Sequence, residues 1–150
     1  MLRIRSIAAA TAAVAAMGIV SMPTPAQAAG SVHLAKIYYD SPGTDSRSNA
    51  SLNAEYVQVR NTTNAAVNLR GWTVTDAADH KYTFGSYSLG RGKTVTIRTG
   101  QGSNTSANLY QQRRAYVWNN DRDTATLKKA NGTRVDSCSY DSTRVDYVTC

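Results

Sequence analysis

The sequence is poor in the side chains from which most enzymes build an active site. It has one glutamate, Glu55, two histidines and two cysteines among 150 residues. It also contains no nucleophile elbow, no P-loop and no His-Glu-x-x-His metal motif. Catalysis needs positioned acids, bases, nucleophiles or metals. The composition therefore argues against an enzyme and predicts neither a cofactor nor a metal.

The two cysteines, Cys138 and Cys150, are too few for a structural zinc site, because the two histidines are distant and zinc sites use closely spaced ligand pairs. In an oxidising compartment an even cysteine count favours a disulfide, and two cysteines allow one intramolecular connectivity. We predict a Cys138–Cys150 disulfide that ties residues 139–149 back to the last strand. An intermolecular disulfide and free thiols are the alternatives.

No apolar run reaches the roughly 18 to 20 residues that a membrane-spanning helix needs. Residues 1–28 instead have the pattern of a secretory signal: Arg3 and Arg5, then an Ala-rich apolar stretch, then the small-x-small site Ala26-Gln27-Ala28. We expect the signal to be removed. The product would be a freely secreted, extracellular protein with one domain, residues 29–150, and no membrane span.

The charge balance is basic. The chain has 17 Lys and Arg against 10 Asp and Glu, a formal net charge of +7. Loss of residues 1–28 removes two arginines, and 15 cations against 10 acids leave +5. Such a balance favours anionic partners such as nucleic acid, anionic cell-wall polymers or acidic lipid headgroups. Solubility alone explains the same balance, so both interpretations stay open.

Residues 29–150 consist of short alternating runs rich in Val, Ile, Thr and Tyr, separated by Gly, Asn, Asp and Ser. This pattern is typical of an all-β sandwich or barrel, and we expect no helix. Alternation places one set of side chains in a shared core: Val57, Val59, Leu69, Trp72, Val95, Ile97, Leu127 and Val135. The predicted strands cover residues 32–39, 55–60, 67–75, 82–84, 93–99, 116–118, 125–129 and 133–139, with long loops at 40–52 and 100–108.

The register of the last hairpin can be predicted from its turn. A three-residue loop at residues 130–132, with Gly132 at positive φ, sets Leu127 opposite Val135 and so pairs two apolar side chains. We therefore prefer it to a two-residue turn.

In that register Lys128 faces Arg134 on the outer surface. Like charges directly opposed across two strands are mildly unfavourable. The pair hints at an anion site, and two solvated side chains that lean apart are the alternative.

Four short motifs occur in fixed order: Asn53-Ala54-Glu55-Tyr56-Val57-Gln58-Val59-Arg60-Asn61, Leu69-Arg70-Gly71-Trp72-Thr73-Val74-Thr75-Asp76, residues 89–100 and residues 118–127. Together they resemble the lamin-tail domain family, in its secreted bacterial type, over residues 32–140. The resemblance implies an immunoglobulin-like β-sandwich, as found in nuclear lamins and in secreted or surface-attached bacterial proteins. It also implies a binding module rather than an enzyme.

The resemblance gives several residues a structural role. Glu55 stands at the acidic position of the family's Asn-x-Glu-aromatic strand, which implies an anchor; a buried carboxylate needs hydrogen-bond partners, since an unpaired one costs several kcal/mol. Trp72 and Trp118 match the family's two aromatic positions and are expected in the core. Arg122 stands where the family's Trp-Asn-Asn-Gly-Asp loop usually has Gly, and it adds a positive charge.

Two acidic segments, residues 40–45 and 121–123, could be interpreted as calcium loops. Neither has the Asp-x-Asp-x-Asp-Gly spacing with a distal Glu. Turn chemistry explains them better, because Asp and Asn side chains bond to their own backbone. His80, next to Asp79, is interpreted as a turn residue rather than as a proton relay.

The leading hypothesis is a secreted, non-catalytic binding module that uses a basic face to hold an anionic polymer, such as nucleic acid or a cell-wall polyanion, or an acidic protein surface. Tyr110 and Tyr116 flank two of the arginines, and aromatic rings beside arginines suit stacking with phosphate contact. Exposed tyrosines without a ligand are the alternative. The predicted contact residues are Arg113, Arg114, Arg122, Lys128, Lys129 and Arg134.

Two other functions are considered. One is a structural or protein-interaction module of the cell envelope that acts through an exposed sheet edge. The other is an extracellular hydrolase, which would need a cleft with convergent carboxylates or histidines.

Overall fold

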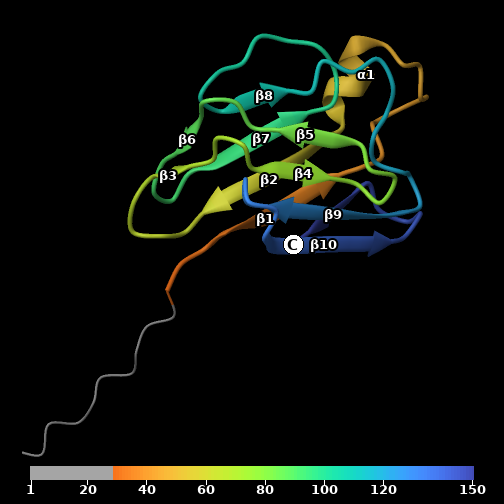
Figure 1. The fold of residues 1–150 in the computed structure, drawn as a ribbon. Helices are drawn as coiled ribbons and strands as arrows, with labels where there is room; N and C mark the ends of the chain where they lie inside the picture. The colour runs from red at the N-terminus through yellow and green to blue at the C-terminus, as the bar shows by residue number, and fades with distance from the viewer. Residues whose placement is uncertain (1–28) are drawn as a thin grey trace, which may run out of the picture.

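The computed structural model describes residues 29–150, which form two packed β-sheets, a small two-stranded ribbon and one short helix (Figure 1). This confirms the predicted all-β sandwich. The proposed signal segment, residues 1–28, lies outside the described residues. Between residues 29 and 150, no helix has the length and apolar character needed to cross a bilayer.

The larger sheet has five strands in the order β11-β1-β2-β7-β8, antiparallel throughout except that β7 and β8 run parallel. Its inward side chains are apolar: Ile37 pairs with Val57, which pairs with Ile97, and none of the three is exposed. Period-2 alternation therefore decides which face of the sheet is buried. The strands are β1 (Val32–Tyr38), β2 (Tyr56–Asn61), β7 (Thr94–Arg98), β8 (Asn108–Tyr110) and β11 (Tyr147–Thr149).

The smaller sheet has four antiparallel strands in the order β10-β9-β4-β5 and packs over the first. Its inward row is Tyr82, Val74 and Leu127, while threonines and lysines of the same strands face outward. The strands are β4 (Thr73–Thr75), β5 (Lys81–Thr83), β9 (Arg122–Lys128) and β10 (Arg134–Asp141).

The common core lies between the two sheets. Six of the eight predicted core residues are buried there, whereas Trp72 and Val135 are partly buried and pack against the core from its margin. Trp118 is 2% exposed and belongs to the core, as the resemblance implied. Tyr39 is also buried, so its neighbour Tyr38 is the tyrosine that faces outward.

The two sheets are joined along one edge of the sandwich. Cys138 on β10 forms the predicted disulfide with Cys150, which follows β11, with 5.7 Å between the two Cα atoms. Asp136 Oδ2 accepts the backbone N–H of Leu34 on β1 at 2.8 Å. These contacts hold β10 against β1 and β11.

One helix forms where the sequence predicted a loop. Helix α1 (Asn49–Ala54) begins after Ser48, whose hydroxyl accepts the N–H of Ser51 and caps the first turn. Leu52 is its one buried residue. The expectation of no helix is therefore wrong at this point, because a good N-cap and one apolar anchor suffice for a six-residue helix packed beside β7.

The predicted strand over residues 67–75 is two strands in different sheets. Residues 67–68 form β3 (Val67–Asn68), which pairs with β6 (Ser88–Leu89) in the ribbon, and the chain then turns at Gly71 before β4. Gly71 has a φ of +77°, a left-handed conformation that favours glycine and breaks the strand.

We predicted a strand at residues 116–118, and this prediction is wrong. The backbone N–H groups of Val117 and Trp118 are donated to the carboxylate of Glu55 instead of to a neighbouring strand. Two short strands that we did not predict, β8 and β11, occur at the edges of the larger sheet.

The last hairpin partly follows its predicted register. The three-residue loop is confirmed: Gly132 has a φ of +85°, and Lys129 pairs with Thr133 through a 2.9 Å backbone hydrogen bond. Lys128 faces Arg134, also as predicted.

The pairing of Leu127 with Val135 is wrong. A bulge at Val135 shifts the strands by one residue, so that Leu127 pairs with Asp136. The gain for this register is electrostatic, because the Asp136 carboxylate then reaches the N–H groups of Leu34 and Ser137.

Candidate functional site

The structure separates the six predicted contact residues. Arg122 begins β9 and forms an ion pair with Asp121 at 3.7 Å, whereas Lys128 ends the same strand. Six residues of extended chain separate the two, about 20 Å. Arg122 is therefore far from the cations at the last hairpin and is paired with an acid.

Three of the remaining cations gather at the hairpin and are joined by one that the sequence analysis missed. Lys128 lies opposite Arg134 on β10 and opposite Thr73 on β4, so all three share the outer face of the smaller sheet. Lys81 on β5 lies opposite Thr75 on the same face. We call Lys81, Lys128, Lys129 and Arg134 the hairpin cluster.

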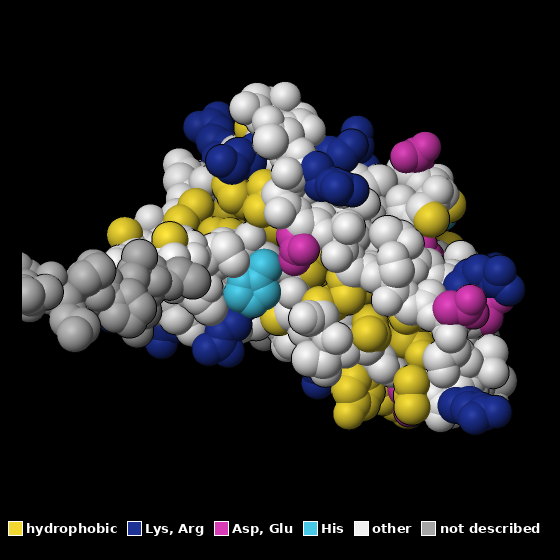
Figure 2. All heavy atoms as spheres, turned by 90° about the horizontal axis from the view of Figure 1, so that it is seen from below, with side chains coloured by type: hydrophobic (Ala, Val, Ile, Leu, Met, Phe, Trp, Pro, Cys, Tyr) yellow, Lys and Arg dark blue, Asp and Glu magenta, His cyan; other side chains and the backbone are white. Residues whose placement is uncertain are grey.

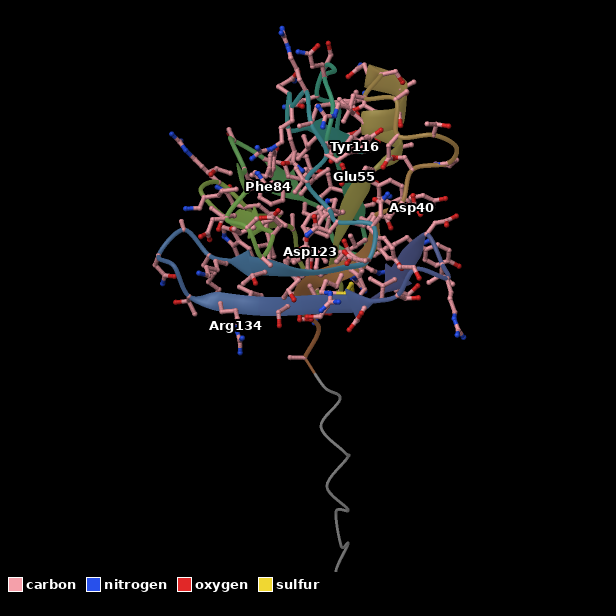
Figure 3. The ribbon with its side chains drawn as sticks, turned by 90° about the vertical axis from the view of Figure 1, so that its right-hand side faces the viewer. Asp40, Glu55, Phe84, Tyr116, Asp123 and Arg134 are labelled. Carbon is pink, nitrogen blue, oxygen red and sulfur yellow. A yellow bond between two sulfur atoms is a disulfide. The ribbon has the colours of Figure 1, made fainter. Side chains whose placement is uncertain are left out.

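Three of the four residues of the hairpin cluster line a hollow of about 290 Å³ in the outer face. Lys81, Lys128 and Lys129 line it together with the hydroxyl-bearing Thr73 and one acid, Asp79. Arg134 extends from the sheet into solvent (Figure 3). Ammonium groups and hydroxyls around one hollow make a surface that can accept a phosphate or carboxylate group.

The other predicted pair, Arg113 and Arg114, lines a second hollow, of about 250 Å³, with Arg47 from the segment before α1. We call these three residues the arginine cluster. Arg113 Nη2 donates to the carbonyl oxygen of Lys81 at 3.2 Å. The arginine cluster therefore borders the hairpin cluster, and Lys81 is the link between them.

Lys81 was missed because its sequence position gives no hint of its neighbours. It follows a turn in which Asp76 accepts the N–H groups of Ala78 and His80, and this turn folds β5 back onto β4. The one available signal is the alternation Lys81-Tyr82-Thr83, which sends Lys81 outward when Tyr82 points inward.

Three of the acids are buried and bond to the backbone rather than to the cations. Glu55, Asp76 and Asp123 are buried. Asp123 accepts the N–H groups of Ala77, Asn119 and Thr124. Among residues 29–150, Arg122–Asp121 is the one ion pair that involves a Lys or Arg. The surface is therefore more basic than the net charge of +5 implies.

Lys and Arg do not cover every side of the molecule. The face in Figure 2 shows them in separate groups around the margin, with polar and apolar surface between them. A single continuous basic face is absent from this view. On this side of the molecule, the basic residues therefore do not form a uniform coat.

Glu55 occupies the interior between the sheets, below Tyr116 in Figure 3. It has no solvent exposure, and its carboxylate accepts the backbone N–H groups of Val117 and Trp118. Burial raises the pKa of Glu55 to about 7, and Thr99 and these two N–H groups offset part of the rise. The geometry supports the anchor role, because Glu55 fixes the segment that follows the arginine cluster.

His80 lies in the turn that joins β4 to β5. The imidazole Nδ1 of His80 lies 2.6 Å from Asp76 Oδ2, so its carboxylate partner is Asp76 and not the adjacent Asp79. Within the described part of the chain, no three His, Cys, Asp or Glu side chains come close enough together to hold a metal.

A row of tyrosines crosses the outer face of the larger sheet. Tyr38 stacks on Tyr56 at 5.4 Å and on Tyr147 at 5.9 Å between ring centroids. Arg98 covers the ring of Tyr56, and Lys36 covers that of Tyr147, at 5.6 and 4.5 Å from the centroids. The rings of Tyr38 and Tyr56 are therefore partly covered by neighbouring rings and by Arg98, whereas Tyr147 keeps 46% of its surface exposed.

The row fits poorly with base stacking, which needs a free ring face. Tyr110, which we had considered for stacking, has its ring against Gly102. The contact is so close that a Cβ added to Gly102 would lie 2.5 Å from the ring. Tyr116 instead hydrogen-bonds to Ser51 at 2.6 Å.

Comparison with known families matches residues 25–142 to the Lamin Tail Domain. A search of curated proteins found no match to the chain.

Proposed function

The chain belongs to the lamin tail domain family, and from that premise we propose that it is an extracellular, non-catalytic module that holds a phosphate-bearing polymer on the hairpin and arginine clusters. The family's immunoglobulin-like domain is a binding or structural domain rather than an enzyme. The Cys138–Cys150 disulfide supports an oxidising, extracellular location.

One observation carries the proposal. Two hollows, each lined by three cations, lie side by side and are connected by the hydrogen bond from Arg113 to the carbonyl of Lys81. A single anion would need one hollow. A polymer with regularly spaced charges can occupy both at once, and the second contact then adds affinity at little further entropic cost.

A sheet-edge function has less support. The long edge strand β10 is held to β1 by the Asp136–Leu34 hydrogen bond and to the chain end by the disulfide. It also carries a bulge at Val135 and the exposed charge of Arg134. Bulges and edge charges are features that oppose pairing with another strand.

The proposal is tested with two probes, a short DNA duplex and purified teichoic acid, which share phosphate chemistry and differ in source. The affinity of the native protein should fall linearly on a log–log plot against salt, with a slope of about −0.9 per phosphate contacted on DNA. The double variant Lys128→Glu/Arg134→Glu should lose at least about tenfold in affinity for the preferred probe.

The matched control is Arg91→Glu/Arg144→Glu, which makes the same charge change at two exposed positions outside both clusters. If the control weakens binding as much as the cluster variant, net charge alone explains the binding and the site is refuted. Binding that ignores salt would instead favour contact through a sheet edge.

A further inference from the structure

The two sheets leave a cleft open at the edge opposite the disulfide. There β5 ends the smaller sheet and β8 ends the larger one. The cleft has a volume of about 420 Å³ and is lined from both sheets, by Tyr82 of β5 and Leu109 of β8. This volume lies within the roughly 300–1,000 Å³ of known small-molecule sites.

Aromatic rings form one wall of the cleft. Tyr82 and Tyr87 line it, and buried Phe84 lies behind them, with ring centroids 5.2 Å from Tyr82 and 6.1 Å from Tyr87. Burial, and then the nearby Tyr87 hydroxyl, raises the pKa of Tyr82, so its phenol stays a neutral hydrogen-bond donor at physiological pH. The wall offers apolar ring surface with hydroxyl groups at its margin.

Hydroxyl and amide side chains form the rest of the lining. Ser86 comes from the segment between β5 and β6, Ser88 begins β6, and Asn104 comes from the loop before β8. The loop is held in place: the Tyr87 hydroxyl donates to the carbonyl of Ser106 at 2.5 Å, and Asn104 Oδ1 accepts the N–H of Tyr110 at 3.0 Å. The polar groups are therefore preorganised rather than mobile.

None of the described residues that line the cleft carries a charge. This contrasts with the hollows of the hairpin and arginine clusters, each of which is lined by three cations. A phosphate group would find no counter-charge in the cleft. A purely apolar ligand would leave the serine and asparagine groups without partners, at a cost in free energy.

We propose that this cleft binds a neutral sugar unit of a glycan, which packs its C–H face on Tyr82 and Tyr87 and hydrogen-bonds through its hydroxyls to Ser86, Ser88 and Asn104. A pyranose has apolar C–H faces and a rim of hydroxyls, and the cleft presents the complementary surfaces in the same arrangement. The site is separate from the anion clusters and does not depend on the function proposed for them.

The test is a titration of the isotopically labelled protein, residues 29–150, with three neutral probes: maltotriose, cellotriose and triacetylchitotriose. At least one probe should give saturable amide shifts at Tyr82, Ser86 and Tyr87, and high salt should not weaken them. Inorganic phosphate should leave the amides of Ser86 and Tyr87 unchanged, since no cation lines the cleft.

Gly85 provides a blocking variant and its control. It lines the cleft, and a Cβ added there meets no atom within 4 Å. Gly85→Leu should fill the space and lower the affinity for the bound sugar by at least about tenfold, whereas Gly85→Ala, whose single methyl leaves room, should bind nearly as the native protein does. The spectra of both variants report whether the fold is kept.

Three outcomes would overturn the proposal: no saturable shifts with any of the three sugars, equal binding by Gly85→Leu and Gly85→Ala, or phosphate that displaces the sugar. None of them bears on the polymer proposal, because the charge variants of that test lie on the other face.

Discussion

The buried carboxylate of Glu55 accepts the backbone N–H of Trp118, and this hydrogen bond joins β2 to the segment that precedes β9. Burial raises the pKa of Glu55 from 4.5 to about 7. Because folding raises this pKa, the folded protein holds the proton more tightly than the unfolded chain does. The stabilisation from Glu55 is therefore complete below about pH 4.5 and is lost as the pH rises through about 7.

We predict that Glu55→Gln removes this pH dependence. Between pH 4.5 and pH 8 the free energy of unfolding of the native protein should fall by roughly 3 kcal/mol relative to that of the variant, as a shift of this size implies. Urea unfolding of both proteins, followed by tryptophan fluorescence at several pH values, measures the difference. Other titrating groups act equally in both proteins and cancel.

Glu55→Ala is the second comparison. It should destabilise the protein at every pH by about 1–3 kcal/mol or more, because the N–H groups of Val117 and Trp118 lose their acceptor in a dry interior. Parallel stability–pH curves for the native protein and Glu55→Gln would show that Glu55 does not titrate in this range.

Removal of the disulfide should release the C-terminal strand. Cys138 and Cys150 are 12 residues apart, and closure of a loop of that size stabilises the fold by about 3 kcal/mol in the chain-entropy view. Cys138→Ser/Cys150→Ser should lower the free energy of unfolding by about this amount. It should also expose to hydrogen exchange the amide of Ile37, which lies opposite Val148, and that of Tyr39, which donates to the carbonyl of Asp146.

Mild reduction of the native protein is the control, since it breaks the same bond without substitution. Unchanged protection of β1 after reduction would mean that β11 is held by its own packing, including the stack of Tyr147 on Tyr38.

The tyrosine row should contribute to stability and not to nucleic-acid binding. Tyr56 is stacked on Tyr38 and covered by Arg98, so Tyr56→Leu should cost about 0.5–1.5 kcal/mol beyond its lost area. Its affinity for a single-stranded oligothymidylate should match that of the native protein in a fluorescence-anisotropy titration. A loss of about 1–3 kcal/mol of binding free energy would instead mean that Tyr56 stacks on a base.

Strand alternation predicted the core because burial and period-2 geometry are local properties of the sequence. Val57, Val59, Val95 and Ile97 are all fully buried on the faces that alternation assigns to them. The same rule failed at residues 67–75, where the positive φ of Gly71 breaks one apparent strand into two. A glycine in an apparent strand can mark a bulge, a bend or the end of the strand, and the sequence does not distinguish these.

The basic clusters were harder to predict, because they depend on which strands are neighbours. Lys128 and Arg134 were paired correctly, since a hairpin is a local structure. Lys81 comes to them through the β4–β9 pairing, and Arg47 meets Arg114 through the position of α1, both contacts between distant parts of the chain. Arg122 was grouped with them on sequence proximity alone, although strand β9 carries it away.

The final prediction concerns the opposed cations Lys128 and Arg134. If they form an anion site, the site costs stability in the absence of ligand, because like charges face each other across β9 and β10. Lys128→Glu replaces the repulsion with attraction and should raise the free energy of unfolding by about 0.2–1 kcal/mol at low salt. The same variant should weaken the binding of the DNA or teichoic-acid probe. Arg144→Glu, at an exposed position with no cation paired opposite, should do neither.

A variant that gains stability while its binding stays unchanged would identify the pair as two solvated surface charges. Urea unfolding and a probe titration, carried out on the same three proteins at low and high salt, distinguish the two results, since screening should erase both effects of Lys128→Glu.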